Sequence, residues 1–529
     1  MANEIVHLPS WKLLLLAVVL LRSLVAGQTV DNEQSHSTSV AGMVQLLELE
    51  AKLIDNLNNY ADELELKLKV VRSFTKQMHK ESSKAMDDTV QYLSNPLNAF
   101  SLIRRMHQDW IHWQQYMEQP VGKQQVNYLQ QMREQLPTST DLEEAGAALH
   151  RIHITYDITI SDMTQGLLNG KKYNVSLNAL DSYALGNYHY DQQNFGYASQ
   201  WIYQAINWLK GPHKLPLPLE LDRAEVFHIY AEALIKMNRY KDAVQVLHTA
   251  TTLKKDNLKL LLRKSEVETL IRTEPNVVPK ALQKPPVLAY ERGCRGQFAQ
   301  NSRLHCVYNS TTSPFLRLAP LKMELIALDP YMVIYHDVIS PSEISELQSL
   351  AVPSLKRATV FNQKSGRNNV VKTRTSKVTW LLDTLNQLTV RLNKRITDMT
   401  GFDMYGSEML QVMNYGLGGH YDKHFDYFNS SIASDLTRLN GDRIATVLFY
   451  LTDVEQGGAT VFPTIEKAVF PQKGAAIVWY NLKHDGNGDT QTLHAACPVI
   501  VGSKWVCNKW IRERQQLFRR PCLSSNKSI

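Results

Sequence analysis

The spacing of apolar residues predicts helices in the first half of the chain. Between residues 46 and 74, apolar positions recur at heptad-like spacing in sequence rich in Glu and Lys: Leu46, Leu53, Leu57, Tyr60, Leu64, Val71 and Phe74. This pattern predicts a long amphipathic helix, paired with another helix or with its own copy, or packed as an ordinary helix in a monomeric bundle. A second helical stretch follows at 98–116, with Trp110 and Trp113 on its apolar side.

Residues 150–255 contain a recurring pattern of small and aromatic residues that is typical of helix-turn-helix repeats. One copy contains Leu185, Gly186 and Ala198, and a second contains Ala231 and Ala243. Their separation exceeds the tetratricopeptide period, and the proline-rich loop 211–218 accounts for the excess. Such repeats form concave grooves for extended peptides. Five tyrosines either line this groove or pack the repeat: Tyr183, Tyr188, Tyr190, Tyr197 and Tyr203.

Beyond the repeats, the apolar pattern changes from helices to short strands. Proline-rich sequence at 274–286 predicts a linker within 256–329, which also holds a loop between Cys294 and Cys306. From residue 330 onward, alternating segments at 331–335, 408–415, 444–451, 475–480 and 504–511 are separated by glycine turns. The chain is therefore a multidomain α + β protein, and its β part is predicted to be a sandwich or jelly roll.

The N-terminus predicts entry into the secretory pathway. Lys12 precedes an apolar run at 13–21, and small residues at 24–27 suit cleavage, so residues 1–27 are interpreted as a signal peptide. An uncleaved membrane anchor is the alternative. We expect no membrane span in the mature chain. The sequence shows no ER-retrieval tetrapeptide at its end, so we expect a protein that is secreted or held in the ER by something else.

Composition and cysteine content agree with a lumenal globular protein. Hydrophobic residues make up 44% and charged residues 21% of the 529, and the net charge of +7 comes without a basic run, so nucleic acid is a poor candidate partner. In an oxidising lumen, Cys294 and Cys306 are natural partners, while Cys497, Cys507 and Cys522 allow one bridge and leave one thiol. Four sequons fit this compartment: Asn174, Asn309, Asn429 and Asn526.

The candidate chemistry is a His-x-Asp pair, two ligands of a divalent metal. Four copies occur, and those beginning at His107 and His189 lie in predicted helices, where residues i and i+2 point apart. The copies at His420 and His424 fall on one extended segment, where i and i+2 share a face, and both remain open. A third ligand would complete a two-His, one-carboxylate set.

The third ligand is expected downstream on another strand. His484 precedes a sequence typical of an exposed turn, whereas His494 precedes an apolar run. Lys504 stands at the start of the last predicted strand, where it is either a solvated lysine or a buried one. A buried lysine needs a carboxylate partner, and a dicarboxylate co-substrate would supply it.

These residues resemble a known family. His424, Asp426, His494 and Lys504 have the spacing of Fe(II)- and 2-oxoglutarate-dependent dioxygenases. The segments around them are similar to the α subunit of collagen prolyl 4-hydroxylase: 411–416, 442–446, 457–463, 504–510 and 519–522.

The resemblance implies that the chain is an oxidoreductase, and it implies a role for each candidate residue. Iron would be held by His424, Asp426 and His494, and 2-oxoglutarate by Lys504 with Tyr415 and Thr460 as hydrogen-bonding neighbours. Oxidative decarboxylation would yield succinate and carbon dioxide and hydroxylate proline at C4 in X-Pro-Gly repeats of procollagen-like chains, with L-ascorbate rescuing oxidised iron. The residues implied to border the peptide are Tyr421, Arg443 and Trp510.

It also implies an architecture and partners. Residues 28–149 would be a helical, coiled-coil dimerisation region, 150–255 a tetratricopeptide-like peptide-binding domain, and 330–522 a double-stranded β-helix catalytic domain. Protein disulfide isomerase would complete an α2β2 tetramer in the ER lumen.

Three positions differ from what is usual in this family: Cys507, Ile229 and Glu232. A retained family bridge would join Cys497 to Cys522 and leave Cys507 free. Ile229 and Glu232 stand where relatives more often carry tyrosine. Two alternatives therefore stay open: the same chemistry on non-collagen secretory proteins, and a non-catalytic peptide-binding adaptor.

Overall fold

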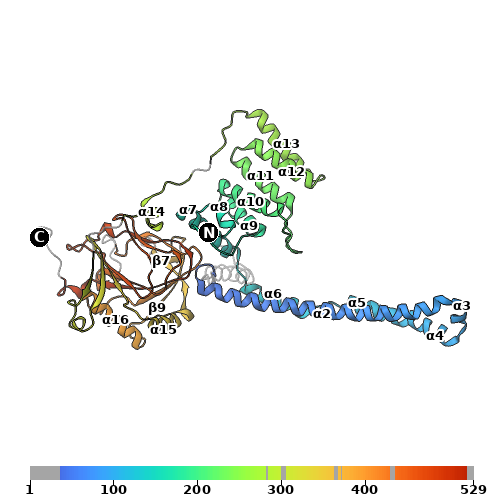
Figure 1. The fold of residues 1–529 in the computed structure, drawn as a ribbon, viewed down its shortest axis with the longest axis horizontal. Coiled ribbons are helices and arrows are strands. Elements are labelled where there is room, and N and C mark those ends of the chain that lie inside the picture. The colour runs from blue at the N-terminus through green and yellow to red at the C-terminus, as the bar shows by residue number, and fades with distance from the viewer. Residues whose placement is uncertain are drawn as a thin grey trace, which may run out of the picture.

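Helices form the first half of the described chain and a β-rich unit the second half, as predicted. The computed structural model describes residues 36–281, 284–299, 305–362, 367–370, 372–428 and 435–520. Figure 1 shows the β-rich unit at one end, stacked helices beside it and a long helical arm pointing away. The predicted signal peptide lies outside the described residues. In the part of the chain that is described, no helix combines the length and apolarity needed to cross a membrane.

The arm consists of one long helix and the shorter helices that return along it. Helix α2 (Val40–Asp87) is 48 residues long, and Ser39 caps its first turn. Helices α3 (Thr89–Ser94), α4 (Pro96–Arg104), α5 (Trp110–Glu118) and α6 (Lys123–Met132) follow, with α5 and α6 running back beside α2 (Figure 1). Phe74 stacks on Trp113 with ring centroids 4.2 Å apart. The predicted helix is thus paired with its own chain in a hairpin, and large apolar side chains stay exposed along it: Leu57, Leu64, Phe100, Ile103 and Trp110.

Stacked helix pairs follow the arm. Helices α7 (Ser139–Tyr156) and α8 (Ile160–Thr164) precede the pairs α9 (Ala179–Asp191) with α10 (Phe195–Lys210) and α11 (Arg223–Lys236) with α12 (Tyr240–Leu253). The small residues of the pattern are where the helices meet: a Cβ on Gly186 would lie 2.4 Å from Ile202. Ala198, Ala231 and Ala243 are fully buried. The small residues therefore allow the helices to pack closely.

The two His-x-Asp copies that were predicted to lie in helices do so. The copy at His107 lies in the π-helical turn Arg105–Asp109, and the copy at His189 lies in α9.

The stretch predicted as a linker contributes to both parts of the chain. It includes α13 (Leu258–Thr273), which packs on α12, and the short helix α14 (Ala289–Cys294). Strands β3 (Cys306–Asn309) and β4 (Leu321–Leu328) join the large sheet at its edge. Between α13 and α14 the described residues form no helix or strand, which is the proline-rich part.

Two large antiparallel sheets form most of the β-rich unit, and two short two-stranded sheets join them: β7 (Thr359–Asn362) with β8 (Arg367–Val370), and β13 (Gln456–Gly457) with β18 (Val499–Val501). The nine-stranded sheet has the order β3-β4-β5-β16-β12-β19-β10-β9-β6, and the four-stranded sheet has the order β11-β17-β14-β15. Helices α15 (Pro341–Ala351) and α16 (Gln387–Thr400) pack on one face of the large sheet. The other strands of the large sheet are β5 (Tyr331–His336), β6 (Lys356–Arg357), β9 (Lys377–Leu381), β10 (Leu410–Tyr415), β12 (Arg443–Tyr450), β16 (Ala476–Tyr480) and β19 (Lys504–Arg512). The small sheet contains β11 (Tyr421–His424), β14 (Thr460–Phe462), β15 (Lys467–Val469) and β17 (His494–Ala496).

Strand alternation separates the two faces of the large sheet. In β19, Trp505, Cys507 and Ile511 face the core under α15 and α16, whereas Val506 faces the small sheet. Successive side chains of a strand point to opposite faces, so Lys504 lies on the side of Val506. This arrangement places the charged residue between the sheets.

The outer face of the small sheet is covered by the helical region. Ile152 and Tyr156 of α7 and Trp201 of α10 form one core with Val461 of β14 and Ala495 of β17. The Tyr156 hydroxyl also donates to the carbonyl of Pro498 at 2.6 Å. The helical and β-rich parts therefore share a hydrophobic core.

The disulfide pattern corrects two expectations. Cys294 pairs with Cys497, with Cα atoms 5.6 Å apart, because α14 packs against β14 and brings the two residues together. Both the Cys294–Cys306 pairing and the Cys497–Cys522 pairing are therefore wrong. Cys306 is free and exposed, and Cys507 is free and buried. Cys522 lies outside the described residues.

A buried histidine cluster joins α7 to the first helix pair. The ring of His150 lies 4.8 Å from that of His189 and 5.0 Å from that of Tyr197, and His153 also contacts Tyr197. Burial, and next the charge of His153, lower the pKa of His150 to about 4. Burial, and next the charge of His150, lower the pKa of His189 to about 3. Both rings are neutral in the folded protein.

We expect the stability of the protein to fall as the pH drops from 6.5 towards 4. The unfolded chain takes up protons at these histidines near pH 6.5, whereas the folded chain takes them up only near pH 4 or below, so protonation favours unfolding in this window. The Tm should decrease by several degrees, and the double variant His150→Gln/His189→Gln should show a flatter dependence. Equal slopes for the variant and the unaltered chain would contradict the assignment.

Candidate active site

A cavity lies between the two sheets and collects most of the predicted site residues. Its lining from the large sheet includes Tyr415, Trp479, Lys504, Asn508 and Trp510. Its lining from the small sheet and its flanks includes Tyr421, His424, Asp426, Thr460 and His494. Eight of the nine predicted residues thus meet in one cavity, and the ninth, Arg443, lies behind it.

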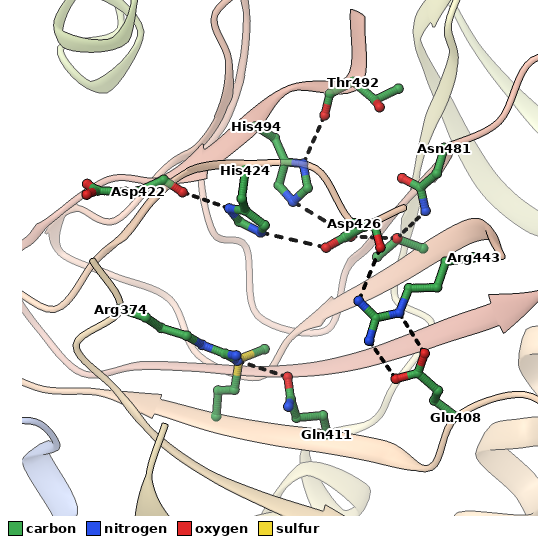
Figure 2. A network of polar contacts seen from close by, with 12 residues as sticks. Arg374, Glu408, Gln411, Asp422, His424, Asp426, Arg443, Asn481, Thr492 and His494 are labelled. Carbon is green, nitrogen blue, oxygen red and sulfur yellow. Dashed lines mark hydrogen bonds and ion pairs between the residues drawn. The ribbon is translucent and has the colours of Figure 1, made fainter. Parts of the chain in front are cut away.

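His424, Asp426 and His494 converge at one point of this cavity (Figure 2). The His424 Nε2 lies 3.6 Å from one carboxylate oxygen of Asp426, and the His494 Nε2 lies 3.7 Å from the other. One ligand atom from each residue lies within 4.8 Å of the others, and among the described residues this is the only such group of His, Cys, Asp or Glu. Two imidazoles and a carboxylate on one side of a metal are the ligands of non-haem Fe(II) oxygenases.

Backbone and side-chain hydrogen bonds orient the three ligands. The Nδ1 of His424 contacts the Asp422 carbonyl at 2.7 Å, and the Nδ1 of His494 contacts the Thr492 carbonyl at 3.0 Å (Figure 2). A carbonyl only accepts, so each Nδ1 carries the proton and each Nε2 keeps its lone pair for a metal. The Thr446 hydroxyl donates to Asp426 at 2.7 Å.

The electrostatics of the triad suit a cation. Burial, and next the neighbouring His494, lower the pKa of His424 to about 3, so this ring is neutral and able to ligate at physiological pH. Burial alone would raise the pKa of Asp426, but His494, His424 and Arg443 together hold it below its ordinary value. The carboxylate is therefore ionised, and the three residues fit a divalent ion.

The competing pair, His420 and Asp422, does not form such a site. His420 is 3% exposed, and its Nδ1 shares a hydrogen bond of 2.8 Å with Thr375. The His420 Nε2 does lie 3.3 Å from the Asp422 carboxylate, but that side chain is half exposed, and no third ligand joins the pair among the described residues. Only the Asp422 carbonyl contacts a triad residue. Strand β11 ends at His424 and has a register shift, so simple alternation does not hold from 420 to 426. Asp426 lies in the bend beyond the strand.

Lys504 occupies the same cavity without a carboxylate partner. Its side chain is fully buried, and burial lowers its pKa to about 7. Its Nζ lies 5.1 Å from the Tyr415 ring centre, and the nearby Thr460 hydroxyl accepts a hydrogen bond from Tyr450 at 2.9 Å. In the described part of the chain no acid forms an ion pair with Lys504. A buried ammonium of this kind is stabilised by an anionic ligand, so the residues fit a dicarboxylate such as 2-oxoglutarate.

The three residues expected near a peptide have different surroundings. Tyr421 stacks on His424 with ring centres 3.6 Å apart, and Trp510 lines the cavity. Arg443 donates to both carboxylate oxygens of Glu408, at 2.6 and 2.7 Å, and to the Asp426 carbonyl at 3.1 Å (Figure 2). Its guanidinium also lies 3.7 Å from the Trp510 ring centre. The contacts of Arg443 therefore support the metal triad from behind.

Three residues of this site were not predicted from the sequence. Arg374 lines the cavity above Tyr421, Glu408 holds Arg443, and Thr446 holds Asp426. A threonine inside the apolar strand β12 was a usable signal for Thr446. Arg374 stands in a polar segment and Glu408 at the first position of the alternating segment 408–415, and neither position indicates a buried contact.

Comparisons with known protein families identify both halves of the chain. Residues 39–170 match the model of the prolyl 4-hydroxylase alpha-subunit, N-terminal region. Residues 410–512, which hold the whole triad and Lys504, match the 2OG-Fe(II) oxygenase superfamily. Fe(II) and 2-oxoglutarate are the cofactor and co-substrate of that superfamily, in agreement with the fit of the cavity.

Several relatives cover nearly the whole chain. Prolyl 4-hydroxylase subunit alpha-2 of Caenorhabditis elegans is 33% identical over 92% of this chain and 93% of its own length. Subunit alpha-2 of Gallus gallus is 34% identical over 93% and 95%, and subunit alpha-1 of Homo sapiens is 32% identical over 97% and 99%.

A solved structure also matches part of the chain. It is the 2OG complex of the viral collagen prolyl hydroxylase vCPH from Paramecium Bursaria Chlorella virus-1, which is 26% identical and covers 34% of this chain and 95% of its own, with a TM-score of 0.28. Sequence identity over almost the full length, together with both family matches, gives the classification. The chain belongs to the prolyl 4-hydroxylase α-subunit family and is an Fe(II)- and 2-oxoglutarate-dependent oxygenase.

Proposed function

We propose that this chain is the catalytic α subunit of an enzyme that hydroxylates proline at C4 in X-Pro-Gly repeats of procollagen-like chains. The observation that carries the proposal is one cavity with a complete metal triad and, beside it, the buried and unpaired Lys504. A decayed site in a peptide-binding adaptor would have no need to keep a buried ammonium, because an unpaired buried charge is costly.

Each residue of the cavity has a defined task in this reaction. His424, Asp426 and His494 hold the iron, and Lys504 pairs with the distal carboxylate of 2-oxoglutarate beside Tyr415 and Thr460. With dioxygen as the oxidant, bound Fe(II) and 2-oxoglutarate would supply the oxidation: one oxygen atom would enter the proline C–H bond as the hydroxyl, the other would enter succinate, and carbon dioxide would leave. Tyr421 and Trp510 orient the proline, and L-ascorbate, typical of the family, restores oxidised iron. Arg443 keeps Asp426 in place.

The helical region supplies binding and assembly in this proposal. The helix pairs at 150–255 are tetratricopeptide-like repeats that bind the proline-rich peptide, and the arm within 28–149 joins two α subunits through its exposed apolar side chains. The β-rich unit, from β3 to β19, is a double-stranded β-helix. Stacked helix pairs and two facing antiparallel sheets support these assignments.

The relatives are named as subunits, which supports an assembly with a second protein. We infer that this partner is protein disulfide isomerase, in an α2β2 tetramer in the ER lumen. In this proposal the partner would retain the chain in that compartment. The signal peptide at 1–27 and the exposed sequon Asn174 support this compartment. The Asn309 side chain is buried and bonded to Tyr335, so it is a poor glycosylation site.

Succinate formation tests the proposal. The full chain, co-expressed with protein disulfide isomerase, should convert 2-oxoglutarate to succinate when given (Pro-Pro-Gly)n peptide, iron and ascorbate, and the peptide should gain hydroxyproline. A protein that binds the peptide without any peptide-stimulated succinate would be an adaptor. Faster turnover of non-collagen proline-rich peptides would instead favour the same chemistry on other secretory proteins.

A further inference from the structure

The loop at 416–419 links the two strands of the site and is enclosed by the helical region. It connects β10, which ends at Tyr415, to β11, which ends at His424. On one side, the Gly416 N–H donates to the Thr38 carbonyl at 3.1 Å, and the Leu417 N–H donates to the Ser37 carbonyl at 3.2 Å. These residues lie just before the helix of the arm.

The other side of the loop packs against α7. A Cβ on Gly418, whose φ is +52°, would lie 2.7 Å from the carbonyl oxygen of Ala148. A Cβ on Gly416 would lie 2.3 Å from the carbonyl oxygen of Ser37. Backbone at such distances leaves no room for a side chain, so glycine is required by the close approach. The loop is therefore confined between two elements that precede the β-rich unit in sequence.

Arg151 is the charged residue of α7 that faces this loop. Its Nε donates a long hydrogen bond of 3.4 Å to the Gly418 carbonyl. Burial lowers the pKa of Arg151, and the charges of Asp422, Tyr188, Tyr290 and Glu144 oppose that change.

Asp422 connects this arginine to the metal triad. Its carbonyl accepts the Nδ1 proton of His424 at 2.7 Å, and its N–H donates to the Thr373 carbonyl at 2.8 Å. A shift of Asp422 would therefore turn the His424 ring and move its Nε2. Groups that hydrogen-bond a metal ligand typically change metal affinity about 10–100-fold when they are lost.

We propose that Arg151 is a positioning residue of the iron site: from helix α7, it holds the Gly418 carbonyl and so fixes the loop that leads to the segment presenting His424 and Asp426 to the metal. The inference rests on the proposed ligand set and extends it to a residue of the helical region. The geometry of the iron site then depends on this one side chain of α7.

Iron retention under anaerobic dialysis tests the role without measuring turnover. Full-length protein in its assembly is dialysed against graded Fe(II), and the bound iron per chain gives the affinity. Arg151→Ala is expected to weaken Fe(II) binding about three- to tenfold, less than a direct partner of a ligand would. Arg151→Gln keeps most of the side-chain volume and should also weaken Fe(II) binding. This variant replaces Arg151→Ala in the test if the alanine variant does not fold.

Arg295→Ala is the matched control. Arg295 is also half-buried and donates to backbone carbonyls of α7, Thr155 at 2.7 Å and Ile154 at 3.2 Å, but it does not contact the loop. We expect it to lower the Tm and leave iron affinity unchanged. In turnover, Arg151→Gln should raise the Fe(II) concentration for half-maximal rate while the KM for peptide stays constant.

The outcomes separate this inference from the proposed function. Equal iron affinity in Arg151→Gln and Arg295→Ala would overturn the positioning role while the ligand set stands. Unaltered protein that retains no iron, or retains it after His494→Ala, would overturn the ligand set and the positioning role with it.

Discussion

His494→Ala is expected to abolish iron retention and peptide-stimulated succinate formation. The Nε2 of His494 is one of three ligand atoms that converge within 4.8 Å, and two remaining ligands hold Fe(II) poorly. Loss of a residue that only hydrogen-bonds a ligand costs about 10–100-fold in metal affinity, so loss of a ligand should cost more than about a hundredfold. Metal analysis after anaerobic dialysis, together with succinate assays, measures both effects.

His420→Ala is the matched control for this prediction. His420 is as buried as His494, but it bonds Thr375 and takes no part in the triad. The variant should lose stability and still retain iron. If His420→Ala lost iron and His494→Ala retained it, the metal site would instead be the other His-x-Asp pair, His420 and Asp422.

Lys504→Met is expected to raise the KM for 2-oxoglutarate sharply while iron binding survives. The methionine keeps the volume of the side chain and removes its charge, so the distal carboxylate of the co-substrate loses its partner. Truncating one member of a buried charge pair typically costs about 2–5 kcal/mol, which corresponds to roughly 30-fold or more in affinity. The Tm of the free protein should not decrease, because the variant removes a buried charge that has no acid partner.

Lys509→Met provides the comparison on the same strand. Lys509 is also fully buried in β19, but it points to the other face and donates to Asp383 at 2.6 Å. Its loss should lower the Tm, since Asp383 keeps an unpaired charge, and should leave the KM for 2-oxoglutarate unchanged. Unchanged co-substrate dependence in Lys504→Met would show that Lys504 is a structural lysine of its strand.

Local patterns of apolar residues were sufficient to predict much of the secondary structure. The heptad-like spacing between Leu46 and Phe74 predicted one helix, and α2 spans the whole stretch. Alternation at 408–415 and 504–511 predicted the central strands β10 and β19 within a few residues. These features are recorded in neighbouring residues, because helix and strand periods follow from backbone geometry alone.

The candidate site was only partly readable from the residues. The His-x-Asp spacing and a lone lysine entering a strand suggested a metal and a dicarboxylate, yet strand geometry left two pairs open, and the family resemblance was needed to choose His424. The structure adds the distinction: the His420 ring hydrogen-bonds Thr375, whereas Asp426, in the bend beyond β11, lies 3.7 Å from the Nε2 of His494.

Local sequence was sufficient to predict the order of helices and strands, the small residues at which helices pack, and the residues able to bind a metal and a dicarboxylate. Three features became visible only in the folded chain: Cys294 pairs with Cys497, Arg443 supports Asp426, and α7 encloses the loop before β11. Such contacts join residues far apart in sequence, and their partners are selected by how sheets and helices pack, which no local period records.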